Sequence, residues 1–461
     1  TAHWRRIDIW RHNLKKIREV EIEGNYLSSR KVGSILYLTA NRWIDCYRME
    51  AGEDTDDPRP YYRDTAAGNN LLAVDYSTIR YFPGCVEPNY LMVAGIDLAK
   101  NEPAVVSTYL GAGENIYCSE KNLYVALNQW QYTPRPLPIG NKVMPEIIAV
   151  PRESKTTVYR LALNDGHPEC TGKGEVPGNI LNQFSMDEYS GYFRIATTTG
   201  EMWRTDEGTS KNNIYVLNDK MTIAGRLEDI APGERIYSTR FMGSRVYMVT
   251  FRNVDPLFVI DLKNPEKPVI LGALKIPGYS DYLHPYDENH LIGFGKDTVE
   301  VKSGEESQAF YTGMKIAMFD ITDVTRPKEI FKEIIGDRGT ESELLRNHKA
   351  LLFSRERNLL AFPVTVMRAD NTSSNDMPGY GKFEFQGAYV YQVDLKQGFQ
   401  LKTRITHLTD EDYQKAGRYW YNSSRNLERI LYINNGLYTL SQGRVRVHDL
   451  STFKDIGNLW L

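Results

Sequence analysis

Apolar and polar residues alternate with a period of two along most of the chain. RIYSTRFMGSRVYMVTF, at residues 235–251, shows two such runs around Gly243. This alternation predicts strands with one buried face, because an amphipathic helix would repeat every 3.6 residues. A glycine between the runs favours a tight turn, so each pair of runs is interpreted as a β-hairpin.

A second kind of segment follows each hairpin, in which a strand ends in a polar turn and another strand begins. VIDLKNPEKPVILGALKI at 259–276 is one example, and MFDITDVTRPKEIFKEI at 318–334 is another. Asp, Asn, Pro and Gly suit such turns because they accept or pre-set the turn dihedrals. The two segments together make a unit of four antiparallel strands, A to D. Arg240 and His284 occupy corresponding positions 44 residues apart, and a repeat of about 40–45 residues is typical of a propeller blade.

Seven full units and one partial unit follow one another along the chain. They are expected at 5–24 (partial), 25–111, 112–178, 179–231, 232–277, 278–335, 336–406 and 425–461. The partial unit looks like the C–D half of a blade, whose A–B half would come from upstream sequence or from the C-terminus. Sheets that cannot bury their own faces do so by stacking around an axis. We therefore predict one all-β domain over 1–461, a β-propeller of four-stranded antiparallel blades, with eight blades favoured over seven and one blade incomplete.

The repeated segments resemble a known family. The likeness is carried by GNYLSSR, YLGAGENIY, LNQFSMDEYSGYFRIATTTGE, APGERIYSTRFMG, TFRNVDPLFVIDL and LKIPGYSDYLHPYDENH. From about residue 17 to about residue 440 the chain resembles the secreted bacterial and archaeal β-propeller proteins described as distantly related to WD40 repeats. The resemblance implies a propeller fold and an extracellular or cell-surface location. It implies no reaction and no catalytic residues.

Long insertions are concentrated at one kind of connection. They fall between strands B and C at 44–88, 129–156, 200–212, 296–312 and 367–386, and between D and A at 407–424. With strand A innermost, both kinds of loop emerge on the same face, and loops on a rigid scaffold commonly carry function. Aromatic residues in these loops suit a protein or carbohydrate partner. The candidates are Tyr61, Tyr62, Trp130, Tyr132, Trp203, Tyr380, Phe383 and Trp420. The alternative is that these side chains pack the loops onto the rim.

A second set of candidates lies at or beside equivalent positions of the A strands. These residues are Arg30, Glu120, Asp187, Arg240, His284 and His348. Innermost strands line the central channel, so a polar ring there suits an anion, a metal or a substrate. The favoured alternative is that neighbouring blades pair these charges, because buried charges need partners.

The segment 52–64 contains clustered carboxylates. Asp54, Asp56 and Asp57 are a calcium candidate because calcium prefers hard oxygen ligands, although a solvated acidic loop is the favoured interpretation. No other cofactor is expected. Cys46 and Cys85 flank the same insertion, and a disulfide between them would close it in an oxidising compartment. The alternative is that all four cysteines are buried thiols.

Composition narrows the range of partners. The formal net charge is −3, which argues against nucleic acid as a partner. No run of 18 apolar residues occurs, so no membrane span is expected. The sequence begins at Thr1 rather than Met, which fits a leader or a longer segment upstream. The G-x-S-x-G, H-E-x-x-H and P-loop motifs are absent, so the sequence leaves open whether the protein is an enzyme.

The pattern therefore predicts an extracellular or cell-surface scaffold that binds a protein or polysaccharide through its elaborated B–C and D–A loops. One alternative is a secreted hydrolase or lyase with its active site at the channel mouth. Another is a structural subunit that assembles with itself into a surface layer or filament.

Overall fold

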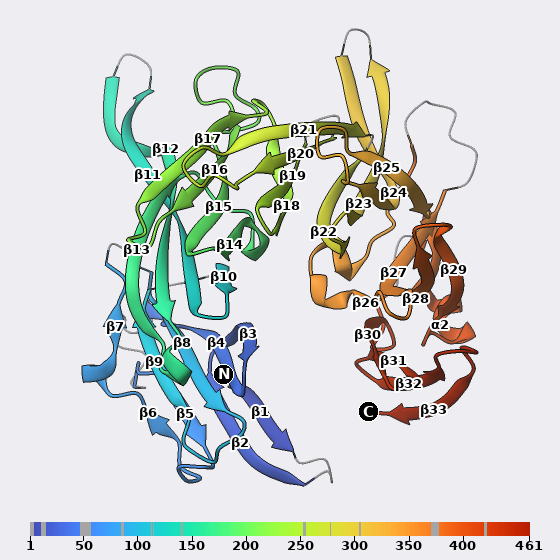
Figure 1. Cartoon of the computed structure of the whole chain (residues 1–461), viewed down its shortest axis with the longest axis horizontal. Helices are drawn as coiled ribbons and strands as arrows, with labels where there is room; N and C mark the ends of the chain where they lie inside the picture. Colours follow the sequence, from blue (N-terminus) through green and yellow to red (C-terminus); the bar gives the residue numbers. More distant parts are fainter. Residues whose placement is uncertain are drawn as a thin grey trace. The chain divides into compact units, whose positions relative to one another are not determined.

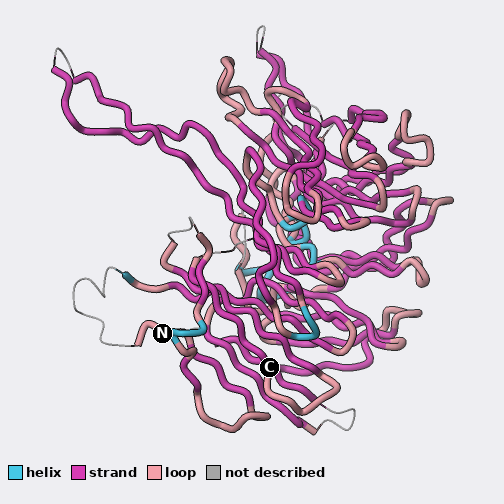
Figure 2. The backbone as a smooth tube through the Cα atoms, turned by 60° about the vertical axis from the view of Figure 1, so that its left-hand side comes forward, coloured by secondary structure: helices cyan, strands magenta, loops and turns pink. Residues whose placement is uncertain are grey.

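The computed structural model describes residues 4–10, 15–46, 57–83, 87–111, 113, 115–139, 142–251, 255–276, 278–303, 306–369, 378–418 and 422–461. The chain divides into two compact units. Unit 1 comprises Thr1–Gly200 and Asn213–Arg226, and unit 2 comprises Glu201–Asn212 and Leu227–Leu461. Strands dominate both units (Figure 2).

The described residues form eight sheets, numbered 1 to 8 in chain order, whose strands are labelled in Figure 1. Sheet 1 contains β1 (Trp4–Trp10), β2 (Lys16–Glu23), β5 (Tyr61–Asp64) and β6 (Leu72–Ala73). Sheet 2 contains β3 (Asn25–Val32), β4 (Ile35–Trp43), β8 (Asn89–Asp97), β9 (Val105–Leu110) and the short β7 (Arg80–Tyr81). Sheet 3 contains β10 (Asn115–Cys118), β11 (Asn122–Ile139), β12 (Lys142–Ala162) and β13 (Glu169–Pro177). Sheet 4 contains β14 (Met186–Tyr189), β15 (Tyr192–Thr199), β16 (Lys211–Leu217) and β17 (Ile223–Ile230), and its last two strands contribute residues to both units.

Sheets 5 to 8 belong to unit 2 and repeat the same order. Sheet 5 contains β18 (Arg235–Met242), β19 (Arg245–Phe251), β20 (Asp255–Asp261) and β21 (Val269–Ile276). Sheet 6 contains β22 (Tyr279–Asp287), β23 (His290–Ser303), β24 (Glu306–Asp320) and β25 (Lys328–Ile335). Sheet 7 contains β26 (Leu352–Ser354), β27 (Leu359–Arg368), β28 (Lys382–Asp394) and β29 (Gly398–Ile405). Sheet 8 contains β30 (Leu427–Ile433), β31 (Gly436–Ser441), β32 (Arg444–Asp449) and β33 (Asp455–Trp460).

Helical structure is scarce in the described residues. The 3₁₀ turns are η1 (Tyr76–Thr78), η2 (Asn164–Gly166), η3 (Gln183–Ser185), η4 (Glu343–Leu345) and η5 (His348–Ala350). The helix α2 (Asp410–Lys415) has a capping box between Thr409 and Asp412. No helix within the described ranges has the length and apolar character needed to cross a bilayer.

The repeated aspartate at the end of strand C has a direct structural role. Asp261, Asp320 and Asp394 each accept a hydrogen bond from the backbone N–H two residues further on, at 2.9, 2.9 and 2.8 Å. Asp97 and Asp449 do the same in sheets 2 and 8. A carboxylate oxygen that accepts from the second following N–H closes the polar turn. This explains why the same Asp-containing segment recurs in successive units.

Neighbouring sheets within each unit bury their apolar faces against one another. The cluster between sheets 5 and 6 contains Tyr247, Val249, Leu257, Val259, Leu283, Leu291, Ala317, Phe319 and Ile321. Comparable clusters join sheets 1 and 2, 2 and 3, 3 and 4, and 7 and 8. Stacked sheets therefore supply the core, as the period-two pattern predicts.

The partial unit at 5–24 is completed in a way that the sequence interpretation did not foresee. β1 pairs with β2, and β2 pairs with β5, which comes from the segment predicted to be a B–C loop at 44–88. Residues 5–24 are therefore not the C–D half of a blade. Their sheet is completed by β5 and β6, and within unit 1 β1 lies beside β3 and β2 beside β4.

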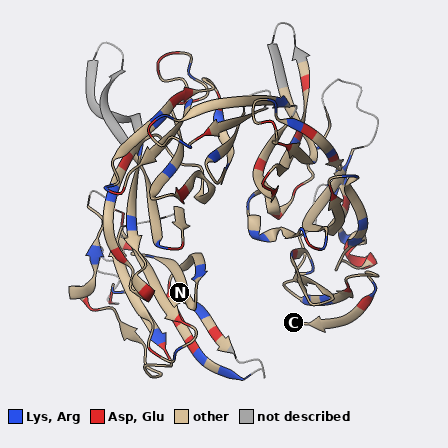
Figure 3. Ribbon diagram, in the orientation of Figure 1, with Lys and Arg blue, Asp and Glu red and all other residues tan. Residues whose placement is uncertain are grey.

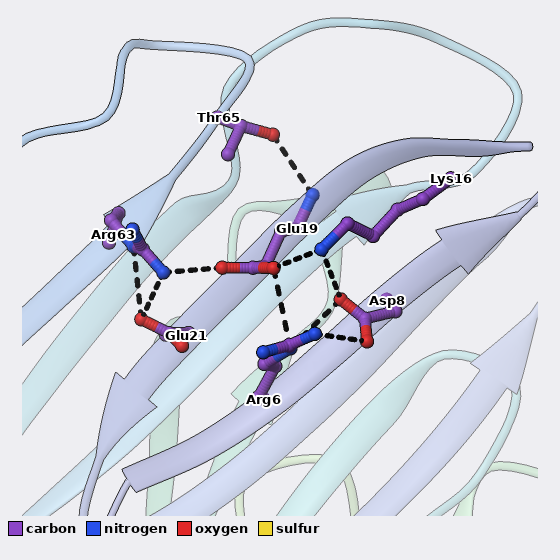
Figure 4. A network of polar contacts seen from close by, with 7 residues as sticks. All are labelled: Arg6, Asp8, Lys16, Glu19, Glu21, Arg63 and Thr65. Carbon is purple, nitrogen blue, oxygen red and sulfur yellow. Dashed lines mark hydrogen bonds and ion pairs between the residues drawn. The ribbon is translucent and has the colours of Figure 1, made fainter.

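Charged side chains attach β5 to sheet 1. Glu19 on β2 lies 2.6 Å from the ammonium of Lys16 and 3.3 Å from Arg6, and it also pairs with Arg63 on β5. Figure 4 shows this network, which extends to Asp8, Glu21 and Thr65. Opposite charges facing one another across strands favour this pairing. Residues that look like a solvated loop in the sequence are thereby drawn into a strand.

A buried ion pair holds the same segment more firmly. The guanidinium of Arg18 donates to both carboxylate oxygens of Asp64, at 2.9 and 2.6 Å. Asp64 also accepts from the backbone N–H groups of Ala66 and Ala104. Burial opposes ionisation, but Arg18 and these two N–H groups lower the pKa of Asp64 below its usual value.

The other insertions lie at the predicted connections. The β11–β12, β23–β24 and β27–β28 hairpins continue their strands beyond the sheets, up to the pairs Ile139–Lys142, Ser303–Glu306 and Arg368–Lys382. The loop at 200–212 closes through a bridge between Glu201 and Thr209. Because these insertions follow the second strand of each sheet, their placement between strands B and C is confirmed.

Candidate binding site on the loop surface of unit 2

Arg338 joins three loops of unit 2. Its guanidinium carbon lies 5.4 Å from the ring centroid of Phe310 on β24 and 4.3 Å from that of Tyr380, which precedes β28. It donates to the carbonyl oxygen of Pro378 at 2.9 Å, and its own carbonyl accepts from the N–H of Gly381 at 2.8 Å. A cation between two aromatic faces is attracted to both rings. The connection after β25 is thus fastened to insertions of sheets 6 and 7.

The connection between sheets 7 and 8 joins the same assembly. Phe383 stacks on Tyr413 of α2 with ring centroids 5.8 Å apart, and its N–H donates to the carbonyl oxygen of Arg418 at 2.9 Å. Residues 296–303, 306–312, 336–346, 378–384 and 407–418 are called the loop surface below. They are the described parts of three insertions, together with the connection after β25, and they hold one another in place.

Several large side chains of the loop surface are open to solvent. Tyr380 is 62% exposed, Val299 44% and Tyr311 41%. Lys, Arg, Asp and Glu are interspersed along the strands of unit 2 (Figure 3). An arrangement of exposed aromatics among charges of both signs suits a partner with apolar and polar groups side by side.

A cluster of charged groups lies where the loop surface meets the sheets. Lys296 on β23 is buried, and its ammonium donates to the carbonyl oxygen of Thr340 and to Oε1 of Glu341 at 2.8 Å. Oε2 of Glu341 lies 3.3 Å from the guanidinium of Arg346. The backbone of Glu341 is held by a bridge to Thr365. Glu341 is therefore held in place through both its side chain and its backbone.

Asp281 belongs to this cluster because β22 is irregular. Ser280 pairs with Gly295 and Tyr282 with Phe294, so Asp281 is an extra residue without a partner on β23. Such a β-bulge redirects a side chain and is common beside functional sites. Burial, together with Glu341 and against the opposing effect of Lys296 and Arg346, raises the pKa of Asp281 to about 7. A partly exposed carboxyl that changes charge near neutral pH can accept or donate a proton in this range.

Aromatic rings line one side of the cluster. Tyr279 packs against Tyr237, Phe251 and Tyr311 with ring centroids 4.7, 5.2 and 5.1 Å apart. Tyr279 is buried, whereas Tyr311 is exposed on β24. The inner rings thus support an outer ring that solvent and a ligand can reach.

Three of the predicted A-strand residues meet in unit 2. His284 on β22 receives electrostatic contributions from Arg240 on β18 and from His348, and burial with these two neighbours lowers the pKa of His284 to about 4. The hydroxyl of Tyr282 lies 3.0 Å from Nδ1 of His284. His348 lies in η5 rather than on strand β26. His284 is therefore neutral at ordinary pH, and its imidazole ring lies near the guanidinium of Arg240.

The A-strand candidates of unit 1 behave differently. Asp187 pairs with Arg194 of the next strand and lies 3.4 Å from the hydroxyl of Tyr117. Glu120 lies in the turn between β10 and β11, not on an A strand, and is exposed. Arg30 is exposed on β3. The charge of Asp187 is therefore paired, but by Arg194 of its own sheet and not by a charged residue of a neighbouring blade.

The predicted aromatic candidates are dispersed. Tyr380 and Phe383 lie on the loop surface, whereas Tyr61 and Tyr62 lie in β5 of sheet 1. Trp130 is 44% exposed at the base of the β11–β12 hairpin, and Trp203 is 78% exposed in the loop at 200–212. Trp420 and the side chain of Tyr132 lie outside the described residues.

Arg338, Phe310, Lys296 and Asp281 were not among the sequence candidates. Neither Arg338 nor Phe310 belongs to a recognisable sequence motif. Their contact is formed only by the tertiary structure. Asp281 precedes His284 by three residues in the repeat, but a bulge leaves no mark in the hydrophobic pattern.

The calcium candidate stays a prediction, because the structure describes one of its three carboxylates. Asp57 is paired with Arg59, whose side chain and N–H lower the pKa of the carboxyl well below its usual value. Asp54 and Asp56 lie outside the described residues. In the part of the chain that the structure describes, no three His, Cys, Asp or Glu side chains converge on a point that would hold a metal. Cys46 and Cys170 are exposed, so the alternative of four buried thiols is wrong. Cys85 lies outside the described residues, and a disulfide between Cys46 and Cys85 stays a prediction.

The sheets and their insertions define a class of protein. Eight sheets of antiparallel strands with four principal strands each, and very little helix, constitute an eight-bladed β-propeller scaffold. Residues 2–453 match the family model described as Beta propeller domain, and the chain belongs to that family.

Two curated relatives are archaeal proteins described as uncharacterised. The chain is 36% identical over 276 residues to one from Methanocaldococcus jannaschii, a match that covers 60% of this chain and 36% of that protein. It is 33% identical over 293 residues to one from Archaeoglobus fulgidus, covering 64% of this chain and 37% of the relative. The chain therefore spans a little over a third of the length of these relatives.

Two solved structures are more distant. A periplasmic gluconolactonase of Pseudomonas aeruginosa has a TM-score of 0.41 at 10% identity, covering 80% of this chain and 91% of that chain. The β-propeller domain of the Trilobed protease of Pyrococcus furiosus has a TM-score of 0.35 at 10% identity, covering 73% and 81%.

Proposed function

We propose that this propeller is an extracellular or cell-surface scaffold that binds a protein or carbohydrate partner through the loop surface of unit 2. The observation that carries the proposal is the position of Arg338 between Phe310 and Tyr380. It fixes an exposed aromatic in a defined place, so little side-chain freedom is lost when a partner binds. Rigid aromatic side chains with a polar surround are the usual anchors of binding surfaces.

The role of Tyr380 can be tested by partner capture. The protein is immobilised and incubated with solubilised envelope from its native cells, and retained partners are quantified by mass spectrometry. Tyr380→Ser is expected to lower retention about ten-fold or more, because an anchor residue carries at least about 2 kcal/mol of binding free energy. Tyr81→Ser is the matched control, since Tyr81 is 70% exposed on β7 in unit 1.

Arg338→Ala provides a second variant at the same surface. It frees Tyr380 without removing its ring, so retention should fall less than in Tyr380→Ser. Undiminished retention by both variants would assign binding to another part of the molecule. The proposed location is tested separately by labelling intact cells with a membrane-impermeant reagent. The hydrolase and surface-layer alternatives stay predictions.

A further inference from the structure

Near Tyr311, charged side chains of the loop surface and of β22 form a group that is called the polar base. Lys296 comes from β23, Asp281 from β22, and Glu341 and Arg346 from the connection after β25. When all four side chains are ionised, the two negative charges of the carboxylates balance the two positive charges of Lys296 and Arg346. The base therefore offers hydrogen-bond donors and acceptors together, without a net charge that would select a simple ion.

Asp281 is the member of this base whose bonding is incomplete. Its carboxyl is partly exposed and accepts no hydrogen bond from any residue that the structure describes. A carboxylate withdrawn from bulk water without hydrogen-bond donors is destabilised, and a ligand that supplies donors relieves this cost. Asp281 is therefore the point at which a ligand gains most.

Tyr311 adds an apolar platform beside the charged groups. Its ring is 41% exposed and is supported from behind by Tyr279, whose centroid lies 5.1 Å away. A sugar ring has an apolar face of C–H groups and an edge of hydroxyls that both donate and accept. An exposed aromatic next to paired carboxylate and cationic groups matches both features.

We propose that Asp281, Lys296 and Glu341, together with the exposed ring of Tyr311, form a saccharide-binding subsite at the base of the loop surface. The proposal rests on the proposed function in taking the loop surface as the binding face, and it names carbohydrate as the ligand class. Ligand hydroxyls donate to Asp281 and Glu341 and accept from the exposed guanidinium of Arg346, and a sugar face lies on Tyr311. Buried Lys296 holds Glu341 in position from behind.

The subsite has a characteristic pH dependence. An ionised carboxylate accepts hydrogen bonds from hydroxyls more strongly than a neutral carboxyl does. Burial raises the pKa of Asp281 to about 7, so affinity should rise from pH 6 to pH 8 and level off above that range. The other charged groups that act on Asp281 are Lys296, Glu341 and Arg346. Burial raises the pKa of Tyr279 and of Tyr311, so both hydroxyls stay neutral over this range. The ring of Tyr237 packs against Tyr279 on the same side.

Titration calorimetry with defined tetrasaccharides tests the proposal. The full chain is titrated at pH 6, 7 and 8 with cellotetraose, chitotetraose, maltotetraose, mannotetraose and tetragalacturonate. At least one is expected to bind, and Asp281→Ala should weaken it about ten-fold or more, the effect of removing a charged hydrogen-bond acceptor. Asp281→Asn keeps the shape of the side chain and should abolish the pH dependence. Glu356→Gln is the control, because Glu356 is exposed on the turn between β26 and β27, at the opposite end of sheet 7.

The results that overturn the proposal are distinct from failure of the proposed function. Absence of binding by all five saccharides, equal binding by Asp281→Ala, or tighter binding at pH 6 than at pH 8 would each refute the subsite. If the partner is lost in Tyr380→Ser but no saccharide binds, the proposed function stands and the subsite falls. If a saccharide binds through Asp281 while Tyr380→Ser keeps its partner, the loop surface is wrong for that partner and the subsite remains.

Discussion

Asp64 illustrates how a single residue joins segments that are distant in the sequence. Its carboxylate binds Arg18, 46 positions away, and the N–H of Ala104, 40 positions away. Both partners of the ion pair are buried, with side-chain exposures of 3% and 1%. Removing one partner of such a pair leaves an uncompensated charge in the interior. Residues of this kind decide which strands belong together in unit 1.

Asp64→Ala should lower the free energy of unfolding by about 3–5 kcal/mol, because Arg18 is left buried without its partner. Glu175→Ala removes one side of the partly exposed pair with Lys155 and should cost less than about 1 kcal/mol. Urea unfolding monitored by circular dichroism measures both. If both substitutions lower the free energy of unfolding equally, burial does not make the Asp64 pair more important for stability than an exposed pair.

The same carboxylate makes stability depend on acid. The pKa of Asp64 is lower in the folded protein than its usual value, so its contribution is complete above the pKa of an unfolded Asp, about 3.9. That contribution is lost as the pH falls through the lower folded-state pKa. Asp64→Asn should therefore unfold with a shallower dependence on pH below about 4 than the wild type. Parallel curves for the two proteins would contradict the assignment.

At the scale of elements, sheets 2, 5, 6, 7 and 8 share the same turn between their third and fourth principal strands. The Asp at the end of strand C accepts from backbone N–H groups of the turn that leads to strand D. The A strands carry a second shared feature, a bulge that lies at Leu27, Tyr237, Asp281 and Glu428 in sheets 2, 5, 6 and 8. The turn is repeated for stability, whereas the bulge places a different side chain in each sheet. In sheet 6 the bulge places the carboxyl of Asp281 near Lys296, Glu341 and Arg346, whereas in sheet 8 the carboxyl of Glu428 accepts from the amide of Gln442.

Asp320→Ala in sheet 6 should cost about 1 kcal/mol, the net value of a hydrogen bond that closes the turn. Asp320→Asn should restore most of that loss, since an amide oxygen accepts from the N–H of Thr322 as the carboxylate does. Thermal unfolding compares the three proteins. If Asp320→Asn is as destabilising as Asp320→Ala, the stability of the turn depends on the charge of Asp320 and not on its role as a hydrogen-bond acceptor.

At the scale of the whole molecule, eight sheets arise from one repeated pattern, but their strands are not all consecutive. The segment that follows β4 leaves sheet 2, supplies β5 and β6 to sheet 1, and returns to sheet 2 as β7 and then β8. Trp43 and Asn89 are paired at the ends of β4 and β8, so a short linker can bridge them. This segment belongs to the core of unit 1, whereas the β11–β12, β23–β24 and β27–β28 hairpins continue beyond their sheets.

Replacing residues 47–86 with a short Gly-Ser linker should therefore destabilise unit 1 strongly, because sheet 1 loses two of its four strands. Shortening the β23–β24 hairpin by removing residues 299–308 is the matched deletion. It should leave the unfolding temperature nearly unchanged, since it removes no strand from a sheet. Differential scanning calorimetry measures both. Tolerance of the first deletion would show that β1 and β2 are stable without β5.

Most of the fold was accessible from the sequence, because hairpin turns, strand alternation and the Asp-containing turn are encoded within a few residues of one another. The insertions were placed at the right connections, since they interrupt a regular repeat, but the strands β5 and β6 within 44–88 were not foreseen. The proposed site was largely missed: of the residues assigned to it, Tyr380 and Phe383 were predicted, but Arg338 and Asp281 were not. Aromatic residues in insertions can be selected as candidates from the sequence alone. The sequence does not distinguish Arg338, which joins three loops, from other surface arginines.

The sequence by itself determined that the chain folds into repeated four-stranded antiparallel sheets, because alternation and turn chemistry act between neighbours along the chain. Tertiary structure alone decided that β5 completes sheet 1, that Arg338 lies between Phe310 and Tyr380, and that Asp281 stands among Lys296, Glu341 and Arg346. Alternation with a period of two predicts which face of a strand is buried, but it does not predict which strand is its neighbour. Those choices depend on ion pairs and ring contacts between residues far apart in the chain, whose energies exist only once the sheets have packed.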